Sequence, residues 1–162
     1  MTGPAGEQIV GWREWFGLPN LGVPRIKAKL DTGARTSALH AFDVERLTID
    51  SREWVQFAVH PLQRDDRTVI SCLAPLLDER GVKNSGGQLE HRYFIETTLR
   101  MDGRDWPIEL SLTNRDQMGF RMLIGRTAMH GRLIVNPALS YSLKRGARRR
   151  RPAKSTPRKE AI

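Results

Sequence analysis

The chain has 162 residues, of which 39% are hydrophobic, and a formal net charge of +9. This length suits one domain with a sizeable core, and no apolar run approaches the ~20 residues that a membrane helix needs. The single cysteine, Cys72, cannot form an internal disulfide, and the first residues lack the basic and apolar regions of a secretory signal. We therefore expect a cytoplasmic protein that does not contact membranes.

Most of the positive charge lies at the C-terminal end of the chain. Residues 144–162 contain nine Lys or Arg and one Glu, whereas residues 1–143 contain 18 basic and 17 acidic residues. The terminal segment has no aromatic residue and contains two prolines, so it cannot build a core. We predict one domain over residues 1–143, followed by a disordered basic tail over residues 144–162.

Short segments rich in β-branched and aromatic residues recur along the domain and are separated by turn residues. The clearest pattern is a hairpin, in which two such segments flank the strong turn pair Asp102 and Gly103. Because no long amphipathic helix and no internal repeat is visible, the pattern predicts an all-β barrel or sandwich. We expect strands over residues 9–16, 26–30, 37–42, 47–49, 54–59, 68–73, 93–101, 106–112, 121–124 and 133–135, a loop over 76–89 and one short helix over 125–131.

The segment 30–34, Leu-Asp-Thr-Gly-Ala, places a carboxylate at the end of an apolar strand. Gly33 would permit the positive φ or the close backbone approach that such a turn often needs. Asp31 then points into whatever space lies beyond the strand. The same residue types also occur in ordinary turns, so a plain hairpin turn is the alternative.

Other residue types give weaker chemical signals. The four histidines are scattered and there is no second cysteine, so the spacing of a metal site is missing, although a zinc site could assemble from distant residues. No glycine-rich phosphate loop is present. We expect no cofactor and no metal, and we expect Cys72 and the four tryptophans to lie in the core because all of them fall in predicted strands.

A second segment, far downstream, suggests a chemical role for Asp31. Residues 122–126, Met-Leu-Ile-Gly-Arg, form an apolar stretch that ends in Gly125 and Arg126. The two motifs together resemble the retropepsin-like aspartic peptidases. They are closest to a bacterial branch labelled ATP-dependent zinc proteases, which is associated with ATP-grasp enzymes that add glutamates to a ribosomal protein. The resemblance covers residues 9–143 and is carried by segments 11–15, 29–41, 112–115, 122–126 and 135–137.

The resemblance implies a closed β-barrel in which Asp31 is the catalytic residue. Thr32 would bond across a two-fold axis and lock two such turns together. Gly33 would let the substrate backbone approach, and Ala34 would line the site. Peptide hydrolysis by carboxyl groups requires two of them, and this chain has one Asp-Thr-Gly. The second Asp31 must therefore come from another copy, so we expect a homodimeric aspartic endopeptidase that acts on proteins or peptides.

The resemblance also assigns supporting residues and exposes one departure. Ile124 and Gly125 would support the Asp turn. Four residues after the catalytic acid, retroviral enzymes carry an acid that can pair with the Arg of Gly-Arg, but this chain has Arg35 there. Arg126 must then find another partner, or none, and both Arg35 and Arg126 are candidates for binding substrate. Arg35 suggests an acidic substrate such as a glutamate-rich tail, or it is simply solvated. We predict that residues 60–67 form the flap.

Two other functions remain open at this point. The chain could be a non-catalytic peptide-binding module that regulates an ATP-grasp glutamate ligase, in which case the ATP of the family label belongs to that partner. It could also be an RNA- or ribosome-binding protein, because the basic tail can neutralise phosphates without reading sequence. The tail could equally hold polyglutamate, or be solvated without a dedicated partner.

Overall fold

The computed structural model describes residues 2–84, 86–114 and 119–143, and it confirms the all-β prediction. No helix within these residues is long and apolar enough to cross a membrane. The elements are β1 (Gln8–Val10), β2 (Arg13–Leu18), η1 (Pro19–Leu21), β3 (Val23–Leu30), β4 (Ser37–His40), β5 (Phe42–Ile49), β6 (Arg52–Val59), β7 (Ile70–Lys83), β8 (Leu89–Met101), β9 (Arg104–Thr113), β10 (Met122–Ile124), α1 (Arg126–Met129) and β11 (Leu133–Val135).

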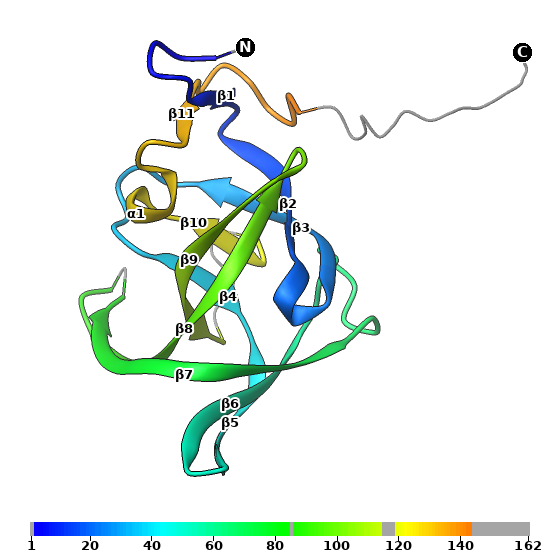
Figure 1. Cartoon of the computed structure of the whole chain (residues 1–162), viewed down its shortest axis with the longest axis vertical. Coiled ribbons are helices and arrows are strands. Elements are labelled where there is room, and N and C mark those ends of the chain that lie inside the picture. Colours follow the sequence, from blue (N-terminus) through cyan, green and yellow to red (C-terminus); the bar gives the residue numbers. More distant parts are fainter. Residues whose placement is uncertain (1, 85, 115–118, 144–162) are drawn as a thin grey trace, which may run out of the picture.

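The main sheet curls into a ring. Its strands follow the order β2-β3-β10-β4-β9-β8-β7-β6-β5, and a bridge between Gly17 of β2 and Arg100 of β8 closes the ring. Strands β7, β6 and β5 continue beyond that closure and form the lower part of the molecule in Figure 1. Strands β1 and β11 form a separate parallel pair at the top of the view in Figure 1.

Strand β10 is inserted between β3 and β4, although β3 and β4 follow one another in the chain. It runs parallel to β3, with Ile124 beside Leu30, and antiparallel to β4, with Leu123 beside Ala38. The segment that joins β3 to β4 therefore lies against the segment that follows β10. This arrangement brings residues 31–36 next to Gly125.

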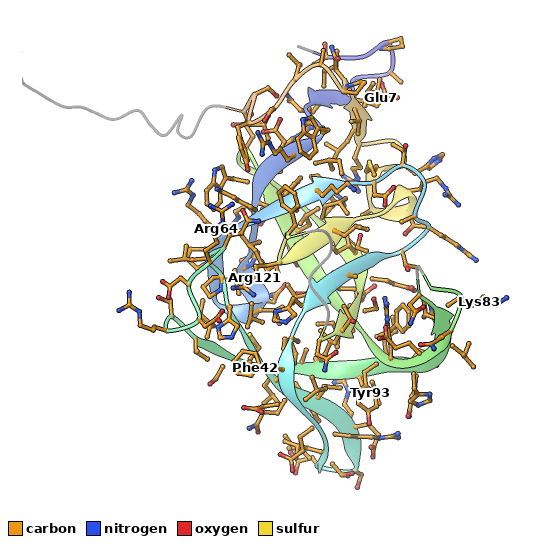
Figure 2. The ribbon with its side chains drawn as sticks, turned by 180° about the vertical axis from the view of Figure 1, so that it is seen from behind. Glu7, Phe42, Arg64, Lys83, Tyr93 and Arg121 are labelled. Carbon is orange, nitrogen blue, oxygen red and sulfur yellow. The ribbon has the colours of Figure 1, made fainter. Side chains whose placement is uncertain are left out.

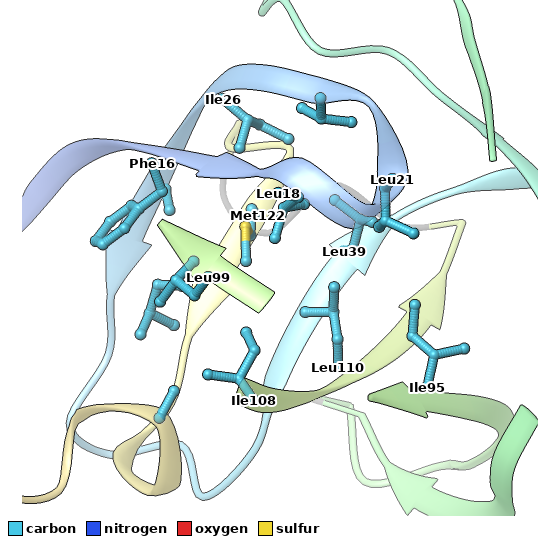
Figure 3. Packing of buried hydrophobic residues seen from close by; sticks show 14 of the residues in the cluster. Phe16, Leu18, Leu21, Ile26, Leu39, Ile95, Leu99, Ile108, Leu110 and Met122 are labelled. Carbon is cyan, nitrogen blue, oxygen red and sulfur yellow. The ribbon is translucent and has the colours of Figure 1, made fainter. Parts of the chain in front are cut away.

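The core lies inside the ring and is filled from one face of each strand. In β3, Ile26, Ala28 and Leu30 are buried in the core cluster, while the alternate residues face outward. Leu39 of β4 and Met122 of β10 pack among the same side chains, as Figure 3 shows. This alternation fixes the face of the ring from which functional side chains can project.

Two segments differ from the prediction. The expected strand 9–16 is broken into β1 and β2, because Gly11 packs against the chain near Leu139, where an added Cβ would lie 2.4 Å from the Leu139 carbonyl oxygen. The expected loop 76–89 is instead mostly strand, because β7 continues to Lys83 and β8 begins at Leu89. Pairing with β8 along its length outweighs the weak strand propensity of this stretch.

The prediction for the tryptophans was wrong for three of the four. Only Trp106 is buried in the core, where its Nε1–H donates to the Ala128 carbonyl at 2.9 Å. Trp12, Trp15 and Trp54 are half-buried on outer faces. Cations pack over these rings, so a neighbouring Arg or Lys covers part of each one and the core does not enclose them. Cys72, by contrast, is buried as predicted.

The C-terminal segment of the domain is held by a buried carboxylate. Glu14 is fully buried and accepts hydrogen bonds from the N–H groups of Gly11, Ser142 and Leu143, and from the Ser142 hydroxyl. These donors compensate the burial of the charge. Glu14 thus fixes the last described residues against β2. The predicted tail, residues 144–162, lies outside the described residues.

Candidate active site

Asp31 directly follows β3, and main-chain hydrogen bonds fix its position. Its N–H donates to the Ile124 carbonyl at 2.8 Å, which continues the pairing of β3 with β10 by one residue. Its Oδ1 accepts from the Gly33 N–H at 2.9 Å, and its carbonyl accepts from Ala34 at 3.2 Å. The carboxyl group is half-buried. The turn therefore presents one oriented carboxylate at the end of a strand.

The segment after β10 clamps the other side of this turn. The N–H of Arg126 donates to the Ala34 carbonyl at 2.7 Å, and the N–H and hydroxyl of Thr127 donate to the Arg35 carbonyl at 3.1 and 3.0 Å. Gly125 is buried against Thr36, where an added Cβ would lie 2.5 Å from the Thr36 carbonyl oxygen. Only glycine fits there, and both Ile124 and Gly125 contact the turn directly.

Arg126 has a partner within the turn. Its guanidinium donates to the Thr32 carbonyl at 3.2 Å, and this main-chain oxygen takes the place of the acid that Arg35 replaces. The side chain of Arg126 is exposed, so it reaches the turn from outside the core. Arg126 therefore braces the Asp31 turn and is poorly placed to bind substrate through that same contact.

Ser37 is a supporting residue that the sequence pattern did not reveal. Its hydroxyl accepts from the Gly125 N–H at 3.0 Å, and its carbonyl accepts from the Ser111 hydroxyl at 3.1 Å. Arg92, also buried, donates to Ser111 at 3.3 Å. This buried polar chain links the turn to β8 and β9. A serine at the start of a predicted strand gives no signal for it, because its partners are distant in the chain.

Thr32 and Gly33, at the tip of the turn, are both exposed. Of the two reasons for a glycine at position 33, the positive φ does not apply, since Gly33 is not among the positive-φ residues. An added Cβ would lie 3.2 Å from Asp31 Oδ1, so the side chain at position 33 would crowd the carboxylate. The tip of the turn is therefore accessible at the surface.

One cleft borders this turn, and another lies farther along β3, where Lys27 is part of its lining. Arg35 and Thr127 line a cleft of about 620 Å³ together with Arg80 of β7, whose hydrogen bond to Asp78 lowers the pKa of that carboxyl. A second cleft, of about 830 Å³, is lined by side chains of the segment 60–67 on one wall. That the segment 60–67 forms the flap stays a prediction. The position of this segment on the wall of a cleft is compatible with that prediction.

The described residues do not fit a zinc site. Across residues 2–84, 86–114 and 119–143, no group of three or more His, Cys, Asp or Glu side chains is arranged to hold a metal ion. Cys72 sits in the core, where burial raises the pKa of its thiol to about 11, far from the thiolate that a metal prefers.

Comparison with protein families matches residues 9–146 to the RimB-like family, described as retropepsin-like aspartic endopeptidase RimB. Among curated proteins, the chain is 49% identical over 143 residues to a probable alpha-L-glutamate ligase of Desulfotalea psychrophila. It is 52% identical over 135 residues to another of Parasynechococcus marenigrum. These alignments cover 88% and 83% of this chain but 31% and 29% of the relatives, so the chain spans about a third of their length.

Among solved structures, the chain is similar to a protein of unknown function from Legionella pneumophila. The TM-score is 0.69 at 24% identity, and the match covers 83% of this chain and 97% of the other. At this level of identity, the likeness shows a shared fold. The family match is more specific, because it extends over most of the chain and includes both the Asp31 turn and β10. The chain therefore belongs to the RimB-like family of retropepsin-like aspartic endopeptidases.

Proposed function

We propose that the protein is an aspartic endopeptidase that acts as a homodimer, with one Asp31 from each of two copies. The observation that carries this proposal is the turn after β3. There the Gly33 N–H and the Ile124 carbonyl orient a half-buried carboxylate at the end of a strand. Membership of the family supports the proposal, because its description names this class of peptidase.

The chemistry requires two carboxyl groups that share one proton. The ionised group takes a proton from a water molecule whose oxygen attacks the peptide carbonyl carbon, while the protonated group donates to the carbonyl oxygen. Collapse of the tetrahedral intermediate breaks the C–N bond, and the amide nitrogen leaves with a proton. One chain supplies a single Asp31 for this work. Two copies related by a two-fold axis supply both groups.

The tip of the turn supports this arrangement. Thr32 and Gly33 are exposed, so both are accessible to a second copy. In the dimer, Thr32 of each copy would bond to the other turn and hold the two carboxylates together. Ala34 would line the site. Arg126 stays engaged with the Thr32 carbonyl and keeps the turn rigid.

The substrate we propose is an acidic or glutamate-modified protein tail. Arg35 is exposed beside the turn, and its guanidinium can reach an anionic side chain in the adjacent cleft. The curated relatives are named probable alpha-L-glutamate ligases, which places similar chain segments in proteins named for glutamate addition. A peptidase that trims such additions, in partnership with an ATP-grasp ligase or a ribosomal protein, fits both observations.

A second candidate is a non-catalytic module that regulates such a ligase through its peptide groove. The observation in its favour is that the chain matches only about a third of each ligase-named relative, so the same domain occurs within longer chains. An oriented carboxylate has no use in such a module. The same substitution that tests the peptidase therefore separates the two functions.

The test is Asp31→Asn, which keeps the size of the side chain and removes its ability to carry the shared proton. We expect hydrolysis of a glutamate-tailed protein to fall roughly 10²–10⁴-fold, with the chain still folded. Because each site needs two copies, titrating excess Asp31→Asn protein into a fixed amount of wild type should also suppress the remaining activity. The assay is run from acid to neutral pH, with a chelator present.

The matched control is Asp43→Asn, which changes an exposed carboxylate on β5 and should leave hydrolysis unchanged. Full activity of the Asp31→Asn protein would rule out the peptidase mechanism. Activity that survives excess variant protein would rule out a site shared between two copies. Loss of wild-type activity with chelator alone would favour a metal-dependent reaction instead.

A further inference from the structure

The side chains of β3 alternate between the core and an outer face, and that outer face leads to Asp31. Ile26, Ala28 and Leu30 are buried in the core cluster, so Lys27 and Lys29 project from the other side. The extended backbone continues to Asp31, whose N–H still pairs with β10. Alternation therefore places the carboxylate on the same face as the two lysines.

The neighbouring strand β2 adds one further cation, Arg13, to this face. The register of β2 with β3 sets Arg13 beside Lys29, and Trp15 beside Lys27. Arg13 and Lys27 both line the cleft of about 830 Å³, with Arg64 and Arg121 on other parts of its wall. The cleft is thus built on the face that carries Asp31.

Aromatic rings hold these cations in position. The Arg13 guanidinium lies 4.6 Å from the ring centre of Trp12 and 4.8 Å from that of Tyr141. The Lys27 ammonium lies 5.2 Å from Trp15 and 5.5 Å from Tyr141. Such contacts limit the side-chain freedom that a ligand would otherwise have to remove on binding. The cations are therefore partly preorganised for an anion.

The side chains that line the cleft are mostly positively charged. Four cationic side chains (Arg13, Lys27, Arg64 and Arg121) line it, against one carboxylate, Asp66. Arg121 is buried and bonds to Asp66 at 2.9 Å, which neutralises one cation of the set. Figure 2 shows Arg64 and Arg121 together on one flank of the molecule. The remaining cations give the cleft a net positive charge that suits an acidic ligand.

An acidic peptide fits this cleft better than RNA does. Single-stranded nucleic acid binds by stacking bases on exposed aromatic faces. Here Arg25 and Lys27 pack against Trp15, and Arg13 packs against Trp12 and Tyr141. The cations therefore occupy the ring faces on which bases would stack. The positive charges remain able to bind carboxylates.

We infer that this cleft is a distal subsite that requires an acidic side chain about four residues from the bond that is cut. Lys27 is four residues from Asp31, and β-structure rises about 3.3 Å per residue, so some 13 Å separates the cleft from the carboxylate. An extended substrate covers this distance in about four residues. This inference rests on the proposed peptidase function. A two-fold axis would set a second, equal cleft on the other side of the scissile bond.

The protein is therefore selective for the length of an acidic segment as well as for its charge. Acidic residues must flank the cleavage point by about four positions on both sides, and a short acidic stretch cannot reach both clefts. The test compares three peptides with one neutral centre. The first carries Glu at the distal positions only, the second carries Gln there, and the third carries the same number of Glu next to the centre. We expect kcat/KM for the distal-Glu peptide to exceed the other two by about tenfold, and the difference to shrink with added salt.

The substitution that tests the cleft itself is Lys27→Gln combined with Arg64→Gln. In this variant, the ratio of kcat/KM for the distal-Glu peptide to kcat/KM for the distal-Gln peptide should fall towards one. The thermal unfolding temperature of the variant should stay close to that of wild type. The control is Lys83→Gln, which removes an exposed cation at the end of β7 that does not line the cleft. This control should keep the full preference.

Binding of the peptides to the Asp31→Asn protein separates the peptidase proposal from the subsite inference, because binding can be measured without hydrolysis. If wild type cuts nothing but the variant still binds the distal-Glu peptide through Lys27 and Arg64, the peptidase proposal fails, and the cleft stands only as a binding site for acidic peptides. If wild type cuts distal-Glu and distal-Gln peptides equally well, the subsite is overturned while the peptidase stands. Displacement of the bound peptide by an RNA of equal charge, at lower concentration than by free peptide, would also overturn the inference.

Discussion

The carboxylate of Asp31 is oriented by the main chain of its own turn. Oδ1 accepts from the N–H of Gly33, and a Cβ at position 33 would lie 3.2 Å from that same oxygen. Position 33 supplies a donor to the carboxylate, and a glycine there avoids a tight contact with the same oxygen.

At the residue scale, Cys72 gives a prediction about pH. Burial raises the pKa of its thiol from 9.0 to about 11, so between these values the unfolded chain loses a proton that the folded chain keeps. Stability contributed by Cys72 is thus fully present below pH 9 and is lost as the pH rises towards 11. We expect the free energy of unfolding to fall by about 1 kcal/mol between pH 8.5 and 10 from this group alone.

The measurement is urea unfolding at several pH values for wild type and for Cys72→Ala. The variant is less stable throughout because it leaves a small cavity, but its decline between pH 8.5 and 10 should be shallower by the stated amount. Lysines and tyrosines titrate equally in both proteins and cancel in the comparison. Parallel curves would show that the thiol ionises as readily in the folded chain as in the unfolded one.

The residues of the site differ in how far the sequence could predict them. Asp31, Gly125 and Arg126 belong to two short motifs, so their proximity followed from the family resemblance. The partner of Arg126 did not follow, because it is a main-chain oxygen of Thr32 that no residue type specifies. Ser37 was missed for the same reason, since its hydroxyl meets the Gly125 N–H only after distant strands have paired.

At the element scale, the contact of Gly125 with the β3–β4 segment is the tightest in the site. A Cβ there would lie 2.5 Å from the Thr36 carbonyl oxygen and 2.9 Å from its nitrogen, and neither main-chain atom can swing away. We expect Gly125→Ala to lower the free energy of unfolding by about 2–3 kcal/mol, because β10 must separate from the segment. Chemical unfolding measures this loss.

The control for this prediction is Gly86→Ala. Gly86 is exposed in the turn between β7 and β8, and the nearest atom to an added Cβ is Asn84 Oδ1 at 3.4 Å. This variant should stay within about 0.5 kcal/mol of wild type. Equal stability of the two variants would mean that the chain around Thr36 yields easily, and that Gly125 does not fix the turn.

Elements that depend on local signals were predicted, and those that depend on pairing were not. The β8–β9 turn was found because Asp102 and Gly103 suit positive φ values, here 50° and 79°. The end of β7, with its charged residues and Gly81, has no local strand signal and is extended only because β8 lies beside it. The insertion of β10 between β3 and β4 is likewise invisible in either segment alone.

At the scale of the whole molecule, the basic tail is expected to add a salt-dependent affinity for RNA. Deleting residues 146–162 removes seven of the chain's Lys and Arg residues. We expect this truncation to weaken RNA binding at low salt and to flatten the dependence of the binding constant on salt concentration, since fewer phosphates are neutralised. A filter-binding titration at several salt concentrations measures both effects.

A full-length variant in which the four arginines at 148–151 are changed to glutamine serves as the control for chain length. It should reproduce most of the weakening if charge is responsible. If the truncated protein keeps wild-type affinity for RNA, the tail has no role in RNA binding. Ligand selection would then lie in the folded domain.

The insertion of β10 has a consequence for when the site comes into being. Asp31 pairs with Ile124, and Arg126 braces Thr32 across a sequence separation of 94 residues. Contacts of such long range form late in folding, after the loop between them has closed. On the ribosome, Asp31 emerges long before β10 does, so a partly synthesised chain carries the acid without the turn that orients it. The peptidase we propose would therefore remain inert until synthesis of its domain is almost finished.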